Sequence, residues 1–248
     1  MYRFFVKTEQ LHDEPIVLCG EDYNHIRNVL RMKQGEEVLL CDGGDKEYLC
    51  TIDGYNTESD QVYLSVADVF GNARELSSKI TLFQGYPKGD KMETIIQKAV
   101  ELGAYEVVPV MMKRCVVKLD DKKAHKKVER FNAIALSAAK QSKRGMIPEV
   151  KDVMTLSEAC NYAKDMDMVL LPYENAQGMQ YAKQVISEAY GKGHIGIFIG
   201  PEGGFDASEV EQIEAIGGKT ISLGHRILRT ETAGMTILSL LMFQLEED

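Results

Sequence analysis

From residue 79 onward the chain alternates short apolar runs with stretches of helical spacing, and this rhythm most constrains the fold. The runs KITLFQGY, YEVVPVMM, MVLLPY, IGIFIG and TISL are apolar nearly throughout rather than at every second position. Strands of that kind lie under helices on both faces of a parallel sheet. We therefore predict an α/β domain with a mainly parallel sheet over residues 79–248. Its helices are expected at KMETIIQKAVELGA, HKKVERFNAIALSAAKQS, QYAKQVISEAY, SEVEQIEAIG and ETAGMTILSLLMFQL.

Residues 1–70 follow a different pattern. Short apolar runs there are separated by turn residues such as Gly35 and Asn56, and only DYNHIRNVLRM has helical spacing. This predicts a small β-rich domain with one helix. Gly71 and small polar residues break the pattern next, so residues 71–78 are predicted to be a linker.

Cysteine use and hydropathy predict a soluble, cytoplasmic protein. The five cysteines are an odd number without a C-x-x-C pair, and no apolar run approaches the roughly 18 residues that a membrane span needs. No group of His, Cys, Asp or Glu has metal-ligand spacing, so no metal is expected.

Charge is distributed unevenly. The net charge of the chain is -9, yet residues 79–150 carry +7, whereas residues 1–72 and 151–248 carry -8 each. The basic middle segment is open to two interpretations, a nucleic-acid-binding surface or a solvated helix face.

Two glycine-containing loops follow predicted strands. The first, Gly200-Pro201-Glu202-Gly203-Gly204, precedes a helix with Asp206 and Glu209 in capping-box spacing. Its spacing fits neither a dinucleotide fingerprint nor a P-loop, so it is either a tight turn or a loop whose backbone a ligand approaches. A side chain at Gly200 or Gly203 would then occupy the ligand's space or demand a disfavoured φ.

The second loop is the elbow SLGHRILRTETA. Gly224 opens it, and seven residues pass before the helical pattern is secure, which places Arg226 and Arg229 on a turn. In open α/β sheets, ligands bind at the carboxyl ends of the strands, so the two loops are expected to form one site. His225 is assigned no role.

Several long stretches resemble a known family. IGPEGGFDASEVE, LGHRILRTETA, YPKGDKMETIIQKAVELG, RCVVK, AAKQSKR and HIRNVLRMKQGE are similar to the signature segments of the RsmE family of 16S rRNA uridine-N3 methyltransferases, in the SPOUT superfamily. The resemblance implies a PUA-like RNA-binding β-barrel over residues 1–70 and a methyltransferase domain over 79–248, with a deep trefoil knot near 169–235. It also implies a homodimer and S-adenosylmethionine as the methyl donor.

The resemblance further implies a donor site of backbone groups and apolar side chains. Leu223, Ile227 and Leu228 would pack on the adenine, although simple core packing is the alternative. The implied donor-binding residues are Leu171, Pro172, Ile199, Gly200, Pro201, Gly203, Gly204, Leu223, Gly224, Ile227, Leu228, Thr232 and Ala233.

Methylation at uridine N3 requires loss of an imide proton and stabilisation of the charge that develops on the base. Arg229 is the candidate stabiliser, because a guanidinium stays charged and presents a fork of donors. Its alternative role is a bracing salt bridge with Glu202 or Glu231, which are also the nearby candidates for a base; water or hydroxide could accept the proton instead.

Contacts to the 16S rRNA substrate are expected from basic side chains, which position a phosphate backbone without reading sequence. The net charge of -8 in the first domain is unfavourable for RNA binding, so either a local stripe or the basic middle segment must hold the RNA. The candidates are Arg3, Arg27, Arg31, Lys88, Lys91, Lys113, Arg114, Lys118, Lys140, Lys143 and Arg144.

Two rival interpretations remain open at this point. One is a nucleic-acid-binding protein whose knotted domain has lost catalysis, and the intact GPEGG and RILRTETA stretches count against it. The other is a SPOUT methyltransferase that acts on another rRNA position or on tRNA.

Overall fold

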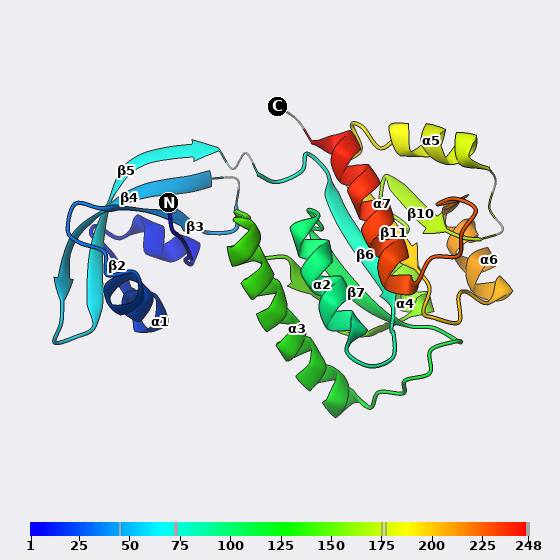
Figure 1. Ribbon diagram of the computed structural model, residues 1–248, viewed down its shortest axis with the longest axis horizontal. Coiled ribbons are helices and arrows are strands. Elements are labelled where there is room, and N and C mark those ends of the chain that lie inside the picture. Colours follow the sequence, from blue (N-terminus) through cyan, green and yellow to red (C-terminus); the bar gives the residue numbers. More distant parts are fainter. Residues whose placement is uncertain (45, 72–73, 175, 177, 247–248) are drawn as a thin grey trace. The chain divides into compact units, whose positions relative to one another are not determined.

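The computed structural model describes residues 1–44, 46–71, 74–174, 176 and 178–246, and the chain divides into two compact units (Figure 1). Unit 1 comprises Met1–Glu75 together with Lys143–Ile147, and unit 2 comprises Leu76–Ser142 and Pro148–Asp248. The division after Glu75 falls inside the range predicted for the linker. No sequence pattern pointed to the return of residues 143–147 to unit 1.

Unit 1 is built on a curled sheet. In the described residues it has five strands in the order β1-β3-β4-β5-β2, and β1 runs parallel to β3 while the other pairs are antiparallel. Alternate residues of β3, β4 and β5 point into a core that includes Val38, Leu40, Ile52, Val62 and Leu64, all fully buried. The elements are β1 (Arg3–Phe5), η1 (Thr8–His12), β2 (Ile16–Cys19), α1 (Gly20–Asn24), η2 (His25–Val29), β3 (Glu37–Cys41), β4 (Lys46–Asn56) and β5 (Gln61–Gly71).

Unit 2 contains the predicted parallel sheet. Its strands follow the order β12-β10-β11-β6-β7-β8, with β9 paired to β7, and every pair among the described residues is parallel. The strands are β6 (Lys79–Gly85), β7 (Glu106–Met111), β8 (Glu149–Val150), β9 (Met154–Thr155), β10 (Met168–Pro172), β11 (His194–Ile199) and β12 (Lys219–Ile221). The α/β fold class predicted from the apolar runs is confirmed.

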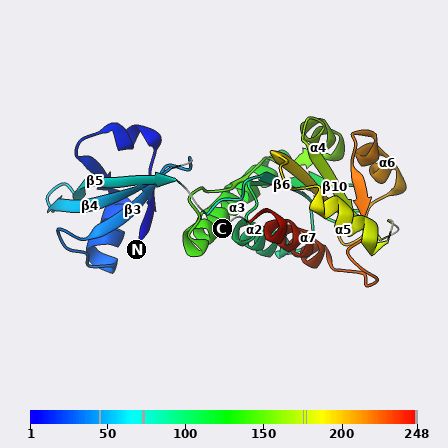
Figure 2. The same cartoon turned by 90° about the horizontal axis from the view of Figure 1, so that it is seen from above.

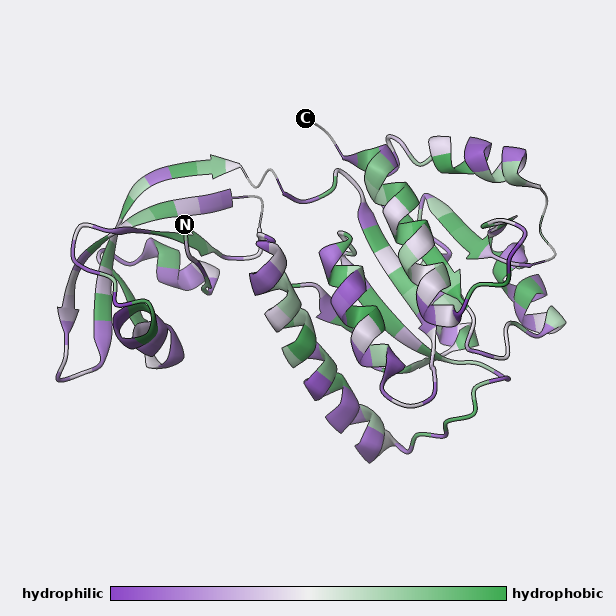
Figure 3. Ribbon diagram, in the orientation of Figure 1, coloured by the Kyte–Doolittle hydropathy of each residue, from purple (hydrophilic) through white to green (hydrophobic). Residues whose placement is uncertain are grey.

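Helices cover both faces of this sheet. Figure 2 shows α4 (Leu156–Ala163) and α6 (Ala207–Ala215) on one side and α2 (Lys91–Glu101), α5 (Met179–Ser187) and α7 (Thr230–Leu245) on the other. The long helix α3 (Asp121–Ser142) packs along α2. Figure 3 shows that the strands of unit 2 are mostly hydrophobic, whereas one end of α3 is strongly hydrophilic. No helix of the described residues is long and apolar enough to cross a membrane.

Helix α4 and the short strands β8 and β9 were not predicted. Two-residue strands are too short to show a period, and α4 has only eight residues. The signal for α4 was present in its N-terminal capping box, in which the Thr155 hydroxyl and the Glu158 carboxylate bind each other's backbone N–H.

Four neighbouring strands end at one edge of the sheet. Leu170 lies level with both Ile197 and Lys219, and Gln84 lies level with Ile199, so β6, β10, β11 and β12 reach their carboxyl ends together. The chain winds outward from β6 through β7 in one direction and fills β11, β10 and β12 in the other. The reversal between β6 and β11 is the kind of position at which open α/β sheets bind ligands.

Candidate functional site

The glycine loop, residues 200–206, leaves β11 at this edge and enters α6. Gly204 adopts a left-handed φ of 69° and donates to the carbonyl of Pro201 at 2.9 Å. Asp206 caps α6 by accepting from Ser208 N–H, and Glu209 binds the N–H of Asp206 in return, so the predicted capping box is confirmed. The loop is therefore a turn of defined shape.

Close packing explains the glycines at 200 and 203 in a way the sequence did not reveal. A Cβ on Gly203 would lie 2.9 Å from the Cβ of Arg114, and one on Gly200 would lie 3.2 Å from the ring of Phe205. Arg114 Nη1 also donates to the carbonyl of Gly203 at 3.0 Å. The left-handed φ belongs to Gly204, and neighbouring protein atoms already restrict a side chain at positions 200 and 203.

The elbow, residues 222–229, connects β12 to α7 at the same edge. Within the described chain, the only peptide N–H of residues 223–228 with a hydrogen bond is that of Gly224, which donates to Ser222 Oγ at 3.2 Å. Ile227 is 86% exposed, and Leu223 and Leu228 are half-buried. Core packing therefore does not account for Ile227, and the elbow presents peptide groups and apolar side chains to its surroundings.

Lys91 joins the glycine loop to the start of α7 by binding one glutamate from each. Its Nζ lies 3.0 Å from Glu202 of the glycine loop and 3.3 Å from Glu231 in the first turn of α7. Hydrogen bonding to Glu202 raises the pKa of Lys91. Burial favours a higher pKa for Glu202, but the hydrogen bonds from Lys91 and the backbone outweigh it and lower that pKa. Glu202 is therefore a carboxylate at neutral pH.

Arg229 is the N-cap residue of α7 and is exposed. Glu202 and Glu231, the partners considered for a bracing salt bridge, bind Lys91, and among the described residues no carboxylate pairs with the Arg229 guanidinium. Arg226 and His225 are exposed on the same elbow. Arg229 is thus accessible from solvent at the N-terminus of α7.

The remaining predicted donor residues surround the same edge in different ways. Leu171 is fully buried and packs in the core with residues of α4 and α6. Pro172 is half-buried, and Ile199 and Pro201 are buried. Thr232 is exposed and Ala233 is half-buried on the first turn of α7.

Two residues at the site were missed by sequence reasoning. Gln84 is a fully buried polar side chain in β6, and its Nε2 donates to the hydroxyl of Thr230 at 2.8 Å. Thr230 Oγ1 in turn donates to the carbonyl of Gly200 at 2.6 Å. The one available signal was a glutamine inside the apolar run KITLFQGY.

The predicted RNA-contacting residues differ in how accessible they are. Arg144 is buried and its guanidinium binds Glu75, which also accepts from the N–H of Gly145 at 3.0 Å. Arg27 lies over the ring of Tyr55 at 4.6 Å. Lys91 begins α2 and Arg114 follows β7, and both contact the glycine loop. The exposed members are Arg27, Arg31, Lys88, Lys113, Arg114, Lys118, Lys140 and Lys143.

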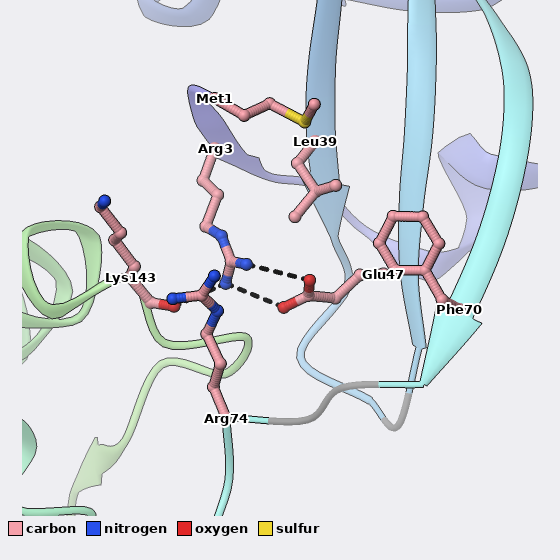
Figure 4. Close-up of a pocket in the computed structure, with 7 residues that line it drawn as sticks. All are labelled: Met1, Arg3, Leu39, Glu47, Phe70, Arg74 and Lys143. Atoms are coloured by element: carbon pink, nitrogen blue, oxygen red, sulfur yellow. Dashed lines mark hydrogen bonds and ion pairs between the residues drawn. The ribbon is translucent and has the colours of Figure 1, made fainter.

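Arg3 and Lys143 line a cavity of about 210 Å³ in unit 1, together with Arg74 and Phe70 (Figure 4). The Arg3 guanidinium binds the Glu47 carboxylate at 2.8 Å and donates to the carbonyl of Lys143 at 2.5 Å. The positive charge of Arg3 is therefore already paired inside the protein.

The open parallel sheet and the small β unit joined to it both match families of RNA methyltransferase domains. The RNA methyltransferase domain family matches residues 74–242, and the RNA methyltransferase PUA domain family matches residues 18–54. The chain belongs to the ribosomal RNA small subunit methyltransferase E family, RsmE.

Relatives match over almost the whole chain. Ribosomal RNA small subunit methyltransferase E of Bacillus subtilis (strain 168) is 40% identical, covering 99% of this chain and 98% of the relative. Its counterpart in Mesomycoplasma hyopneumoniae (strain 232) is 33% identical over 96% of this chain and 98% of the relative.

Solved structures agree. A putative methyltransferase from Legionella pneumophila in complex with the bound cofactor SAM superposes with a TM-score of 0.77, at 33% identity over 96% of each chain. Ribosomal RNA small subunit methyltransferase E from Neisseria gonorrhoeae, bound to S-adenosyl methionine, gives a TM-score of 0.79 at 28% identity, over 96% of this chain and 95% of that one.

Proposed function

We propose that this protein is an S-adenosylmethionine-dependent methyltransferase that acts in the cytoplasm on the small ribosomal subunit and methylates N3 of a specific uridine in the decoding region of 16S rRNA. The observation that carries the proposal is the elbow at the carboxyl edge of the sheet, with peptide groups free for a ligand beside the glycine loop. The S-adenosylmethionine-bound relatives support this choice of donor.

The chemistry of the two loops fits this donor. Ile227, Leu223 and Leu228 offer apolar surface to an adenine, and the unpaired N–H groups of the elbow can bind its polar edges. When bound, S-adenosylmethionine supplies an electrophilic methyl group. The protein's own task is then to hold the acceptor nitrogen in line with it, which brings much of the rate acceleration.

The N3 proton of uridine must leave before or during methyl transfer. Glu202 and Glu231 are both engaged by Lys91, and the lowered pKa of Glu202 makes that carboxylate a weak base. We therefore assign proton acceptance to solvent and charge stabilisation to Arg229, whose exposed guanidinium can donate to the oxygens on which charge develops.

RNA binding is assigned to exposed basic residues that have no buried partner. Lys140 lies on α3 and Lys143 follows it, and both are exposed. Arg144 is instead assigned a bracing role through Glu75. Arg27 and Arg31 provide positive charge on unit 1, whose overall charge is negative. Phosphate contacts of this kind weaken as salt rises.

A homodimer is the proposed assembly, with α7 at the interface. Phe243 is 86% exposed and Leu240 39% exposed on this helix, which is apolar nearly all round. Light scattering of the wild-type protein and of Phe243→Glu tests this, since the variant is expected to shift a dimer toward monomer. A monomeric wild type at working concentration would remove the claim.

The function is tested by methylation of small subunits from a strain that lacks the activity, followed by mass-spectrometric mapping of the product. The expected result is one methyl group on N3 of one uridine of 16S rRNA. Methylation at another rRNA position or on tRNA would identify a different SPOUT activity. A protein that binds RNA but shows no thermal shift with S-adenosylmethionine would be a non-catalytic binder.

A further inference from the structure

The buried amide of Gln84 lies beneath both ligand loops. Gln84 is fully buried in β6, level with Ile199, the last residue before the glycine loop. The next residue, Gly85, approaches the loop so closely that a Cβ there would lie 2.6 Å from Pro201. An uncharged polar group buried at such a position is unfavourable unless it forms hydrogen bonds.

The hydrogen bonds of Gln84 have a defined direction. Its Nε2 donates to the carbonyl of Gly85 at 3.0 Å and to Thr230 Oγ1 at 2.8 Å. A carbonyl can only accept, so the nitrogen must be the atom that faces Gly85. Because Thr230 receives a proton from Gln84, its own hydroxyl proton points to the carbonyl of Gly200, 2.6 Å away.

We propose that Gln84 is a positioning residue for the methyl-donor site: its amide orients the Thr230 hydroxyl, and Thr230 then holds Gly200 and the start of the glycine loop against the first turn of α7. This relay links three elements that are distant in sequence, namely the end of β6, the loop after β11 and the N-terminus of α7 (Figure 1). Thr230 directly follows Arg229, so the relay also sets where the helix that carries Arg229 begins.

The second polar atom of the amide supports this assignment. Gln84 Oε1 is buried and has no hydrogen-bond partner among the described residues. An apolar side chain of the same shape would avoid the cost of that unsatisfied oxygen. The amide nitrogen is therefore the atom that accounts for a glutamine at this position, because it donates to Thr230 and so orients the Thr230 hydroxyl.

The inference rests on the proposed function, since it names the residues that shape the donor site. It is tested by calorimetric titration of S-adenosylmethionine into the full-length protein at 25 °C and by melting curves without ligand. The variants are Gln84→Met, Thr230→Val and Thr230→Ser. The matched controls are Gln97→Met on the exposed face of α2 and Thr236→Val, whose hydroxyl binds only within α7.

Thr230→Val and Gln84→Met are each expected to raise the Kd of S-adenosylmethionine roughly tenfold, the scale of one lost, well-placed hydrogen bond. The double variant is expected to bind S-adenosylmethionine no more weakly than the weaker-binding single variant, because both substitutions break the same relay. Thr230→Ser keeps the hydroxyl and is expected within about twofold of wild type, as are both controls. In single-turnover assays, the donor concentration that gives half the maximal rate should rise by a larger factor than the rate at saturating donor falls.

Folded Thr230→Val and Gln84→Met proteins with a wild-type Kd would overturn the inference while leaving the proposed function intact. A lower Tm alone, with unchanged affinity, would likewise reduce the relay to a structural contact. If Gln84→Met does not fold, the pair Thr230→Val and Thr230→Ser decides the question. A wild-type protein that does not bind S-adenosylmethionine would overturn the proposed function and this inference together.

Discussion

Gly85 at the end of β6 and Pro201 in the glycine loop are in direct backbone contact: a Cβ on Gly85 would lie 2.6 Å from both the Cδ and the backbone N of Pro201. Backbone atoms cannot move aside as a flexible side chain can. The position of the glycine loop relative to the central strand therefore depends on the absence of a side chain at residue 85.

Gly85→Ala is expected to displace the glycine loop, to lower the free energy of unfolding by about 1 to 3 kcal/mol and to weaken donor binding at least tenfold. Denaturant melts and calorimetry measure the two effects. Gly54→Ala is the control, because a Cβ there meets nothing within 4 Å. Wild-type affinity in Gly85→Ala would mean that the loop can shift without affecting the site.

Gly203→Ala is expected to push Arg114 away from the loop and to raise the Kd of S-adenosylmethionine roughly tenfold, as for a lost well-placed contact. Adding Arg114→Gly removes the Cβ that lies 2.9 Å away and should restore part of the affinity. The comparison separates two causes. If Arg114→Gly alone binds the donor like wild type, a double variant as weak as Gly203→Ala would show that the new methyl group occupies space needed by the donor.

Arg229→Ala is expected to lower the single-turnover rate by about 100-fold or more, the scale of removing one preorganised donor to a developing anion. Donor affinity should change little. Arg229→Lys keeps the charge but not the planar fork, so its rate should be intermediate, and higher pH should partly rescue Arg229→Ala by ionising the imide.

The control for Arg229 is Arg226→Ala, an exposed neighbour on the same elbow. A donor-saturated Arg229→Ala enzyme within about threefold of the wild-type rate, under roughly 1 kcal/mol in barrier, would end the catalytic assignment.

Arg144 and Lys140 are expected to behave differently although both belong to the basic middle segment. Arg144→Ala leaves Glu75 without its buried partner and should cost about 3 kcal/mol of unfolding free energy. Lys140→Glu should leave stability within about 0.5 kcal/mol but weaken RNA binding and reduce its salt dependence. Equal stability of the two variants, or an unchanged salt slope in Lys140→Glu, would contradict this division of roles.

His194 predicts a pH dependence of stability at the opposite end of the sheet. Its ring lies 2.8 Å from Thr81 Oγ1, which donates to the buried Glu106. Burial lowers the pKa of His194 below 6.5, with Lys79 acting in the same direction and Glu106 and Asp167 opposing it. As pH falls, the imidazole is therefore protonated in the unfolded chain before it is protonated in the folded protein. The contribution of the neutral His194 to the free energy of unfolding is present above pH 6.5 and is lost as pH falls below that value.

Melting curves between pH 7.5 and 5 on His194→Asn and wild type measure this contribution. The variant should lose less stability on acidification, whereas His125→Asn, at an exposed site on α3, should follow wild type. If the Tm of His194→Asn and of wild type falls by the same amount between pH 7.5 and 5, groups other than His194 determine the loss of stability at low pH.

The local sequence was sufficient to predict the elements that carry the function. Nearly continuous apolar runs predicted β6, β7, β10, β11 and β12 within about a residue or two, because a strand covered on both faces lacks the regular polar alternation of a half-exposed strand. The capping pair Asp206 and Glu209 predicted the start of α6, since such a box is a contact between residues three apart. The elbow was also recognised from local sequence, because it is a polar interruption between two apolar segments.

Only the tertiary structure decided which residues act on one another across the sheet edge. The contacts of Gly85 with Pro201, Arg114 with Gly203, Gln84 with Thr230, and Lys91 with Glu202 and Glu231 all join segments separated by many residues. From the sequence, Arg144 and Lys140 were equally good candidates for RNA contact. Only the structure showed that Arg144 is buried against Glu75. The periodicity of a sequence shows which face of its own helix or strand a residue occupies. Strand order is set only when the chain folds, and strand order decides which residues each loop contacts.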